Sequence, residues 1–507
     1  MKGDFTRDTF DPAKHFSRVL MQQGRVTLDA DSNEQAAILL YYLRTLARDL
    51  MGPYAAPAGA EGGFLLTSAT SDGFTISKGR YYVDGILVEN AAECTYSTQP
   101  DYSPPTDDAL LAAMKQSGEK KFWLYLDVWE RHITPIEDDT IREKALGGAD
   151  TCTRTKVVWQ VKAWVSETQA PALGGGTAAK QLTKLQETRK KLEQQAKKAT
   201  GEKLDKIKKE IDAIDAQIAK YDESAAGAVG DPTSCADLLN RLQRTDKPNL
   251  AARVDPGAQD QGVCVISPDA KYRGAENQLY RVEIHQGGSV GVATFKWSRD
   301  NGSIATAWLG NAGGEFELEV ANARGFAAGN WVELSDDTLD LREEPGVLVK
   351  LAKVEGNVLS VDPDSLPASA SLAWSEYPLK PKVRRWDQIQ TEDVVLYQGA
   401  VPVQESLSPP GEPVWIDLED GVQIQFASGG RYRSGDYWLI PARVATGNIE
   451  WPGHEPLADG TVTPRALPPH GVEHHYAPLD FVTWTDGKMQ VTNQCRCDIS
   501  PPCPRLP

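Results

Sequence analysis

The pattern of apolar and polar positions predicts β-strands along most of the chain. Residues 121–133 and 155–166 alternate aromatic or β-branched side chains with polar ones, which is the two-residue period of a half-buried strand. Residues 277–309 show the same alternation, interrupted by Gly-rich and Asn-Gly turns. Residues 74–90 predict a hairpin with its turn at the Asp-Gly pair 84–85.

Near the N-terminus the period changes from two to between three and four. Residues 25–30 alternate as a strand does, and the apolar residues that follow form the stripe of an amphipathic helix. Gly52 and then Pro53 end that helix in the usual order. The stripe consists of Ala36, Leu39, Leu40, Leu43, Leu46, Ala47 and Leu50.

The acidic stretch DADSNE (29–34) joins this strand to the helix. It begins like a calcium-binding loop, but Glu34 stands where that loop needs glycine, and Leu40 stands where it needs a bidentate glutamate. We interpret the stretch as a helix start in which residues three apart form a capping box. The two candidate pairs are Asp31 with Glu34 and Ser32 with Gln35.

Changes of pattern predict a mainly β fold with α insertions, built from several β-sandwich or barrel modules. After a Gly- and Ala-rich leader at 171–180, two leucine and isoleucine seams predict an antiparallel helical hairpin inserted into a β-rich domain. The predicted units are 1–104 (strand, helix and hairpin), 105–310 (β-rich core), 176–224 (the hairpin inserted in that core), 311–364 (a small barrel), 365–484 (C-terminal β-rich domain) and 485–507 (extended tail).

Composition narrows the classes of function. The 507 residues carry a formal net charge of −17, which repels phosphate backbones and argues against nucleic-acid binding. The N-terminus has charges where a signal peptide has its apolar stretch, and no run is long enough to insert into a membrane, so we expect cytoplasmic synthesis. The seven cysteines include no CxxC pair, and reduced thiols are expected.

No motif predicts a catalytic residue. GGSVG (287–291) matches a nucleophile elbow around Ser289, but a strand pattern follows it where the elbow needs a helix, so a hairpin turn is favoured. The sequence therefore favours a protein without catalytic activity and without a cofactor.

A structural zinc site near the C-terminus is the one candidate for metal binding. HGVEH (470–474) has the spacing of an inverted zinc-peptidase motif, but the flanking prolines argue against the helix that this motif requires. Buried or turn histidines are the alternative interpretation. The candidate ligands are His470, His474, His475, Cys495, Cys497 and Cys503.

Several stretches resemble an uncharacterised protein family encoded in the loci of phage-tail-like contractile injection systems. Its signature resembles KGDFTRDTF followed by QGRVTLDAD and NEQ within residues 2–35. The other similar stretches are GRYYVDGILVEN (79–90), YLDVWERHITPIEDDTIREKALGGADTCTRTKVVWQVK (125–162), ENQLYRVEIH (276–285), FKWSRDNGSIAT (295–306), GDYWLIPAR (435–443) and HHYAPL (474–479).

This resemblance implies a component of an injection particle that is associated with its tail, baseplate or fibres. The expected partners are tube, sheath, spike or baseplate proteins together with further copies of this chain, and the particle would leave the cell by lysis. Two other hypotheses remain: a cargo effector or β-rich hydrolase carried by the particle, and a fibre module that binds a cell-surface receptor or glycan.

Overall fold

The structure is a computed structural model, and it is mainly β, as the sequence predicts. It describes residues 1–59, 61–70, 73–105, 108–165, 231–255, 271–367, 370–391, 394–405, 414–454, 462–485 and 487–499, together with Arg189, Leu192 and Ile214. The predicted hairpin at 176–224 lies outside the described residues except for these last three, which are helical. Leu192 and Ile214, one from each predicted seam, are buried.

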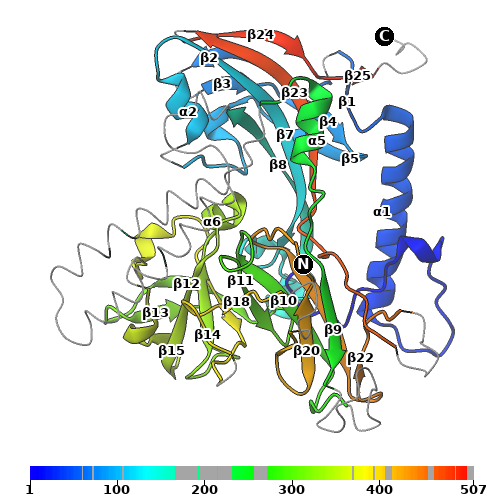
Figure 1. Cartoon of the computed structure of the whole chain (residues 1–507), viewed down its shortest axis with the longest axis vertical. Coiled ribbons are helices and arrows are strands. Elements are labelled where there is room, and N and C mark those ends of the chain that lie inside the picture. Colours follow the sequence, from blue (N-terminus) through cyan, green and yellow to red (C-terminus); the bar gives the residue numbers. More distant parts are fainter. Residues whose placement is uncertain are drawn as a thin grey trace.

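A long helix, α1 (Asp29–Met51), lies along one side of the molecule, and the segment that precedes it loops outside (Figure 1, dark blue). The predicted strand at 25–30 does not form. Instead Asp29 begins the helix and accepts hydrogen bonds from the backbone N–H and hydroxyl of Thr6 at 2.9 and 2.6 Å. Asp31 accepts the N–H of Leu28 at 3.3 Å, which is one half of a capping box. The two predicted pairs do not form it, since Glu34 accepts the Thr9 hydroxyl and Gln35 accepts the N–H of Val19. The acidic stretch therefore holds a helix end, and Gly52 caps the other end.

Strands β1 to β8 and the last strands of the described chain, β23 to β25, come together in one unit, which we call the terminal module (Figure 1, top). Its core joins three sheets, with strand orders β25-β1-β4-β5, β2-β3-β6 and β24-β23-β7-β8. The elements are β1 (Tyr54–Pro57), β2 (Leu66–Thr70), β3 (Gly73–Ile76), β4 (Gly79–Val83), β5 (Ile86–Asn90), β6 (Cys94–Thr95), α2 (Ala109–Met114), β7 (Glu119–Ile133), β8 (Arg154–Val165), α5 (Cys235–Leu242), β23 (His474–Thr485), β24 (Lys488–Gln494) and β25 (Asp498–Ile499).

A second unit, the central module, has its own core between a five-stranded and a three-stranded sheet. The strand orders are β18-β11-β10-β21-β22 and β19-β20-β9. The strands are β9 (Leu250–Val254), β10 (Gln278–Gln286), β11 (Thr294–Ser298), β18 (Val401–Pro402), β19 (Ile416–Asp417), β20 (Val422–Phe426), β21 (Tyr437–Arg443) and β22 (Asn448–Ile449).

The third unit is a closed six-stranded barrel with the order β12-β13-β16-β15-β14-β17. Its core of Val, Leu and aromatic side chains is separate from the other two cores. The range 311–364 contains four of the six strands whole, and β12 and β17 close the barrel from either side of that range. The elements are β12 (Ala305–Asn311), β13 (Glu317–Val320), β14 (Trp331–Ser335), α6 (Asp337–Arg342), β15 (Val347–Glu355), β16 (Val358–Val361) and β17 (Lys382–Trp386).

Local turn chemistry agrees with the sequence prediction at two hairpins. β4 and β5 pair antiparallel around Asp84 and Gly85, which both have positive φ. The glycines of 287–291 lie between the antiparallel strands β10 and β11, so Ser289 is in a hairpin connection and not in a nucleophile elbow. The short 3₁₀ helices are Pro12–Lys14, Tyr96–Thr98, Asp139–Ile141, Lys144–Leu146, Pro363–Ser365 and Trp374–Glu376.

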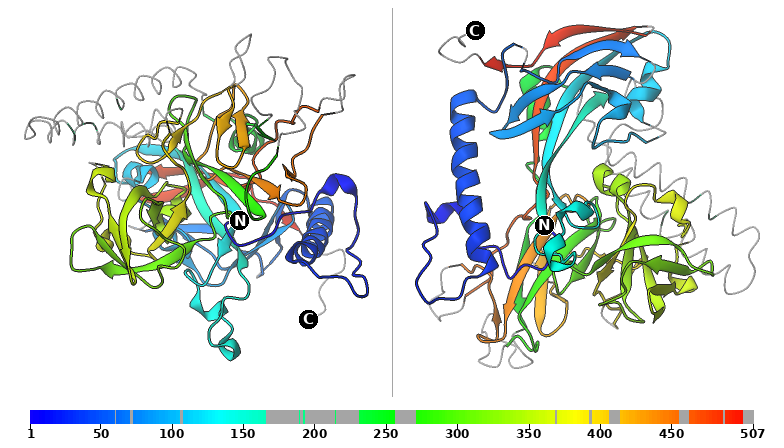
Figure 2. Two further views of the ribbon diagram at one scale, coloured as in Figure 1. Left: turned by 90° about the horizontal axis from the view of Figure 1, so that it is seen from below. Right: turned by 180° about the vertical axis from the view of Figure 1, so that it is seen from behind.

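The modules do not follow sequence order. β17 belongs to the barrel, β18 to β22 to the central module, and β23 to β25 to the terminal module, although all of these follow one another in the chain. Division of the chain by sequence order does not represent this arrangement, because the terminal and central modules are each assembled from segments that are distant in the sequence (Figure 2). The strands of the barrel, β12 to β17, are consecutive in the chain.

Candidate functional site

His474, one of the predicted metal ligands, lies in a buried polar cluster where the modules meet. Its Nδ1 is 2.7 Å from Asp127 Oδ1 on β7, and Lys162 Nζ on β8 is 2.7 Å from the other oxygen of the same carboxylate. The imidazole stacks on Trp129, with ring centroids 4.9 Å apart. Antiparallel pairing of β23 with β7 and of β7 with β8 positions these side chains side by side.

The cluster extends from the terminal module to both other modules. Glu343, directly after α6 in the barrel, lies 3.6 Å from His474 Nε2 and 3.6 Å from Lys162 Nζ. Arg433, in the connection between β20 and β21 of the central module, donates from Nε to Glu343 at 2.6 Å. The Glu343 carboxylate of the barrel thus pairs with Lys162 of the terminal module and with Arg433 of the central module.

The charges of this cluster are mutually stabilised. Burial alone would raise the pKa of Asp127, but His474 and Lys162 outweigh burial and hold that pKa below its ordinary value. The pKa of Glu343 is likewise lowered, because Arg433, His474 and Lys162 together outweigh burial. The carboxylates are therefore ionised and matched by cations of the chain itself.

A second buried cluster fixes the barrel to the lower end of β7. Lys382 on β17 places Nζ 2.8 Å from Glu137, 3.1 Å from Asp337 and 2.6 Å from Asp340. Arg131 on β7 forms a further ion pair with Asp337. Burial lowers the pKa of Lys382, but the three carboxylates outweigh it and raise that pKa above its ordinary value. The ammonium group thus occupies the position between the carboxylates that a metal ion would take.

A third cluster lies between the central module and the barrel. Lys296 on β11 reaches Glu333 on β14 at 2.5 Å and Glu283 on β10 at 3.4 Å. Arg281 pairs with Glu283 at 2.6 Å, and Lys2 joins the same carboxylate at 2.9 Å. The N-terminal residues are therefore built into a joint between two modules.

In the described part of the chain, two groups of three metal-capable side chains lie close together: Asp127, Glu343 and His474, and Glu137, Asp337 and Asp340. Lys and Arg side chains already neutralise both groups, so their donor sets do not fit a resident metal. The clusters instead join the modules, because each carboxylate pairs with cations from neighbouring elements.

The other predicted metal ligands do not join the group of Asp127, Glu343 and His474. His475 Nδ1 contacts Asp84 at 2.9 Å, and His470 stacks on Tyr437. Cys497 is exposed and free, and Cys503 lies outside the described residues. Neither group of metal-capable side chains found in the described ranges includes His470, His475, Cys495 or Cys497.

Cys495 forms a disulfide with Cys235, which corrects the expectation that all thiols are reduced. The bond ties α5 to the end of β24, and its sulfur atoms pack beside Trp123 and Leu238. The two cysteines are 260 residues apart in the sequence, so their spacing gave no sign of the pairing.

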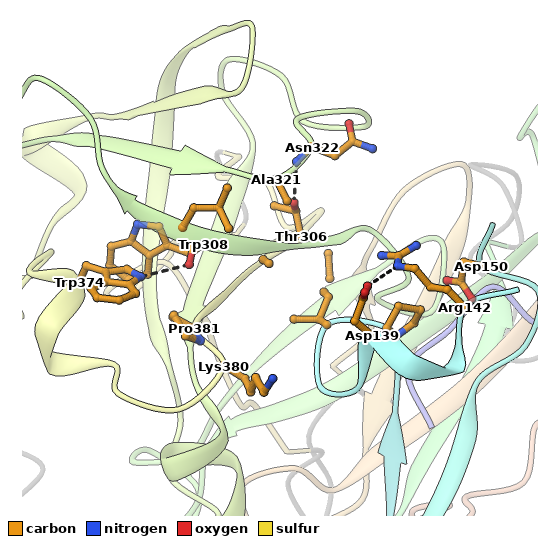
Figure 3. A pocket seen from close by; sticks show the side chains of 15 residues that line it. Asp139, Arg142, Asp150, Thr306, Trp308, Ala321, Asn322, Trp374, Lys380 and Pro381 are labelled. Carbon is orange, nitrogen blue, oxygen red and sulfur yellow. Dashed lines mark hydrogen bonds and ion pairs between the residues drawn. The ribbon is translucent and has the colours of Figure 1, made fainter. Parts of the chain in front are cut away.

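A groove of about 600 Å³ lies between the barrel and the loop that follows β7 and contains the Asp139–Ile141 turn (Figure 3). The exposed Trp374 lies on one side and donates from its indole N–H to the Trp308 carbonyl at 3.1 Å. The ion pair of Asp139 and Arg142, 2.7 Å apart, lies on the other side. An aromatic face beside hydrogen-bonding groups can bind an extended polar chain.

Sequence reasoning found His474 but missed its partners and the groove. Asp127 stands 347 residues from His474, and Trp374 lies in a stretch whose prolines and serines indicate only a linker. The alternating pattern of 121–133 predicts the strand that carries Asp127. Asp127 is a charged residue in the middle of that apolar strand. A charged side chain at such a position indicates a buried residue that is ion-paired in the interior, and this was the available signal.

Taken together, the fold and the clusters define a mainly β protein of three interlocked modules. The chain belongs to a family of unknown function, DUF6519, whose sequence profile matches residues 1–506. No curated protein matches the chain.

Among solved structures, the chain is similar to one described as the crystal structure of TssK. The identity is 8%, the match covers 73% of this chain and 96% of that one, and the TM-score is 0.13. A TM-score of this size does not indicate a common fold. In the described ranges, no helix combines the length and the apolar character needed to cross a membrane.

Proposed function

We propose that this protein is a non-catalytic structural component of a phage-tail-like contractile injection particle that acts through protein–protein contacts. The observation that carries the proposal is the apolar surface of α1 and of the segment before it. Soluble monomers rarely expose contiguous large apolar patches, and such patches mark surfaces that bind other proteins. The exposed side chains include Phe16, Leu20, Met21, Val26, Leu39, Leu40, Leu43, Leu46 and Leu50.

The ion-pair clusters support this proposal because they connect the three modules to one another. A component that transmits or bears load needs its modules fixed relative to one another. Removal of one partner from a buried ion pair is strongly destabilising, so the modules resist separation. The cations of these clusters also occupy the carboxylates that an acid–base or metal mechanism would require to be available.

The particle setting rests on the sequence resemblance in residues 2–35 and 125–162. On this basis the partners are tube, sheath, spike or baseplate proteins, assembled with the chain after its synthesis in the cytoplasm and released with the particle by lysis.

The test is to isolate intact particles from cells that carry a tagged copy of the full chain. A fixed ratio of this chain to sheath and tube proteins in the sedimented particles, with the chain accessible to added protease, supports the proposal. Absence of the chain from intact particles overturns it. Protection from protease until the particle is opened would indicate cargo, and would overturn the structural role as well.

The groove favours one second candidate, a glycan-binding fibre module. Trp374 exposes 43% of its surface beside the groove, and an exposed aromatic face is suited to stacking on a sugar ring. A glycan array read with the wild-type chain and with Trp374→Ala tests this candidate. Trp451, whose indole N–H donates to the Arg465 carbonyl outside the groove, provides the control variant Trp451→Ala.

A further inference from the structure

The Cys235–Cys495 disulfide lies in an apolar contact to which several other residues contribute. Cys235 is the first residue of α5, and Cys495 directly follows β24. α5 lies against β23 (Figure 1), and its Leu238 is completely buried beside Trp123. The indole N–H of Trp123 donates to the Pro232 carbonyl at 3.1 Å, which fixes the chain just before α5. Packing and this hydrogen bond therefore hold α5 in position independently of the covalent bond.

The same packing places the two cysteines next to each other. Their Cα atoms are 5.7 Å apart, a separation that is usual for a disulfide. Phe481 stacks against Trp123 beside them, with ring centroids 4.4 Å apart. The side-chain amide of Asn493 donates to Cys235 Sγ at 3.8 Å. The bond can thus close and open with little movement of the backbone.

The two cysteines differ in access to solvent. Cys235 is half-buried, whereas Cys495 exposes only 6% of its surface, so a dissolved reagent reaches Cys235 first. Cys235 also begins a helix, where the N–H groups of the first turn stabilise a thiolate. Asp237 in the same turn opposes this effect, but its carboxylate is paired with Arg241 at 2.9 Å. Cys235 is therefore the thiol that reacts first, and Cys495 is the thiol that completes the bond.

The proposed function moves the chain between two redox environments. Reducing conditions in the cytoplasm keep protein thiols reduced, and disulfides form and persist mainly outside it. Under the proposed function the chain is made in the cytoplasm and leaves with the particle by lysis. A pair of cysteines that is already held together then changes its oxidation state at that step.

We propose that Cys235 and Cys495 are an oxidation site, which is a dithiol in the cytoplasm and becomes a disulfide on release by exchange with a small-molecule disulfide such as glutathione disulfide. The Cys235 thiolate attacks one sulfur of glutathione disulfide, which forms a mixed disulfide and releases one glutathione thiolate. The Cys495 thiolate then attacks the Cys235 sulfur and releases the second glutathione thiolate. The chain loses two protons and two electrons, and one glutathione disulfide becomes two molecules of glutathione.

The bond has a mechanical consequence for the body of the protein. Cys235 and Cys495 are 260 residues apart, and the central module and the barrel lie between them in the sequence. A bond that closes so long a loop removes many conformations from the unfolded chain, so the oxidised chain resists unfolding more than the reduced chain does. Assembly precedes the bond, and the body is strengthened when the particle leaves the cell.

Oxidation of the purified full chain tests the site directly. The chain is reduced with dithiothreitol, freed of reductant and incubated with glutathione disulfide, and its thiols are then alkylated and mapped by mass spectrometry. Cys235 and Cys495 should lose their thiols together. Cys495→Ser should instead keep one glutathione on Cys235, because the second thiol is missing. Cys152→Ser removes an exposed thiol elsewhere and is the matched control, which should leave the oxidation of the pair unchanged.

Far-UV circular dichroism of the wild-type chain separates oxidation from folding. The reduced and the oxidised chain should give the same spectrum at room temperature, because packing holds α5 in both. A reduced chain that has lost structure would show that the bond is needed for folding, and would overturn a site that closes after assembly.

Alkylation in cells tests where the bond forms. In acid-quenched cells that carry the tagged full chain, N-ethylmaleimide should label nearly all of Cys235 and Cys495. After lysis and exposure to glutathione disulfide, the label should fall to nearly nothing until a reductant is added. A disulfide already present in the quenched cells overturns the proposal, and so do thiols of the pair that persist after this exposure.

The inference rests on the proposed function for the place of oxidation, and the two can fail separately. If the chain is absent from intact particles but its cysteine pair changes from thiols to a disulfide on release, the structural role fails and the oxidation site stands. If the chain sediments with particles at a fixed ratio but is already oxidised in quenched cells, the oxidation site fails and the structural role stands.

Discussion

Gly85 lies directly against the backbone of Arg44. A Cβ placed on Gly85 would be 2.1 Å from the Arg44 carbonyl oxygen, and Gly85 has a φ of +78°, which side-chain-bearing residues rarely adopt. The β4–β5 turn therefore needs glycine both for its own shape and for its contact with α1. The same turn positions Asp84, which pairs with His475, so one hairpin fixes the helix and contacts the last long strand.

Gly85→Ala is expected to displace α1 from the terminal module. The left-handed backbone alone costs about 1–2 kcal/mol, and the contact with a backbone atom adds a similar loss because neither segment can yield easily. Gly147→Ala is the matched control, since Gly147 has a φ of +76° and no atom within 4 Å of the added Cβ. Urea denaturation gives the two stabilities, and limited proteolysis of residues 1–51 reports on α1. Equal losses and unchanged proteolysis would show that α1 does not rest on this turn.

The Cys235–Cys495 disulfide is expected to stabilise the terminal module by about 2–4 kcal/mol, because it shortens the unfolded chain between two distant segments. Reductant should lower the melting temperature of the wild-type chain but not that of Cys235→Ala with Cys495→Ala. Cys152→Ser, which removes an exposed free thiol, should leave the response to reductant unchanged. Alkylation of Cys235 and Cys495 in unfolded, non-reduced protein would show that the bond is absent.

The sequence predicts individual elements well because their signals are local. The alternation in 121–133, the Asp-Gly turn at 84–85 and the glycine after α1 each depend on a few neighbouring residues. The stripe of α1 shows the limit of such signals. Its period correctly predicts a helix, but a period only says which residues share a face and not what covers that face. In the single chain, nothing described covers Leu39, Leu43, Leu46 and Leu50.

The candidate site was less predictable than the fold because it depends on pairings across long stretches of sequence. His474 was singled out for its neighbours in HGVEH, yet the residues that it contacts are distant in the sequence: Asp127 and Trp129 lie on the paired strand β7, and Glu343 belongs to the barrel. Histidine spacing indicates a metal only if the local backbone is helical, and here it leads into β23.

Replacement of Lys382 by methionine is expected to destabilise the protein by about 3–5 kcal/mol near pH 7, because three carboxylates lose their shared cation in the interior. The pKa values of Glu137 and Asp340 lie below their ordinary values, since Lys382 outweighs the effect of burial. Their stabilisation is therefore present above the ordinary carboxyl pKa of about 4 and is lost as the pH falls below it.

The difference in unfolding free energy between wild type and Lys382→Met should accordingly shrink as the pH falls below about 4. Lys353→Met removes an exposed partner of Glu355 and should change stability by less than about 0.5 kcal/mol at either pH. A difference that stays constant from pH 7 to pH 3 would show that packing of the lysine side chain, and not its charge, stabilises the junction.

Asp480 is expected to oppose folding at neutral pH. Burial on β23 raises its pKa to about 6, although the nearby Arg496 partly counteracts burial. Between pH 4 and pH 6 the folded state therefore binds more protons than the unfolded state, and stability falls as the pH rises through this range. Asp480→Asn keeps the size of the side chain without its charge, so it should stabilise the protein by about 1–2 kcal/mol at pH 8, after allowance for partial solvation, and by almost nothing at about pH 3. Asp498→Asn, which removes an exposed partner of the same Arg496, is the control and should show no change centred near pH 6. Thermal unfolding at a series of pH values measures both variants, and equal melting temperatures of wild type and Asp480→Asn at pH 8 would mean that the buried carboxylate is compensated by Arg496.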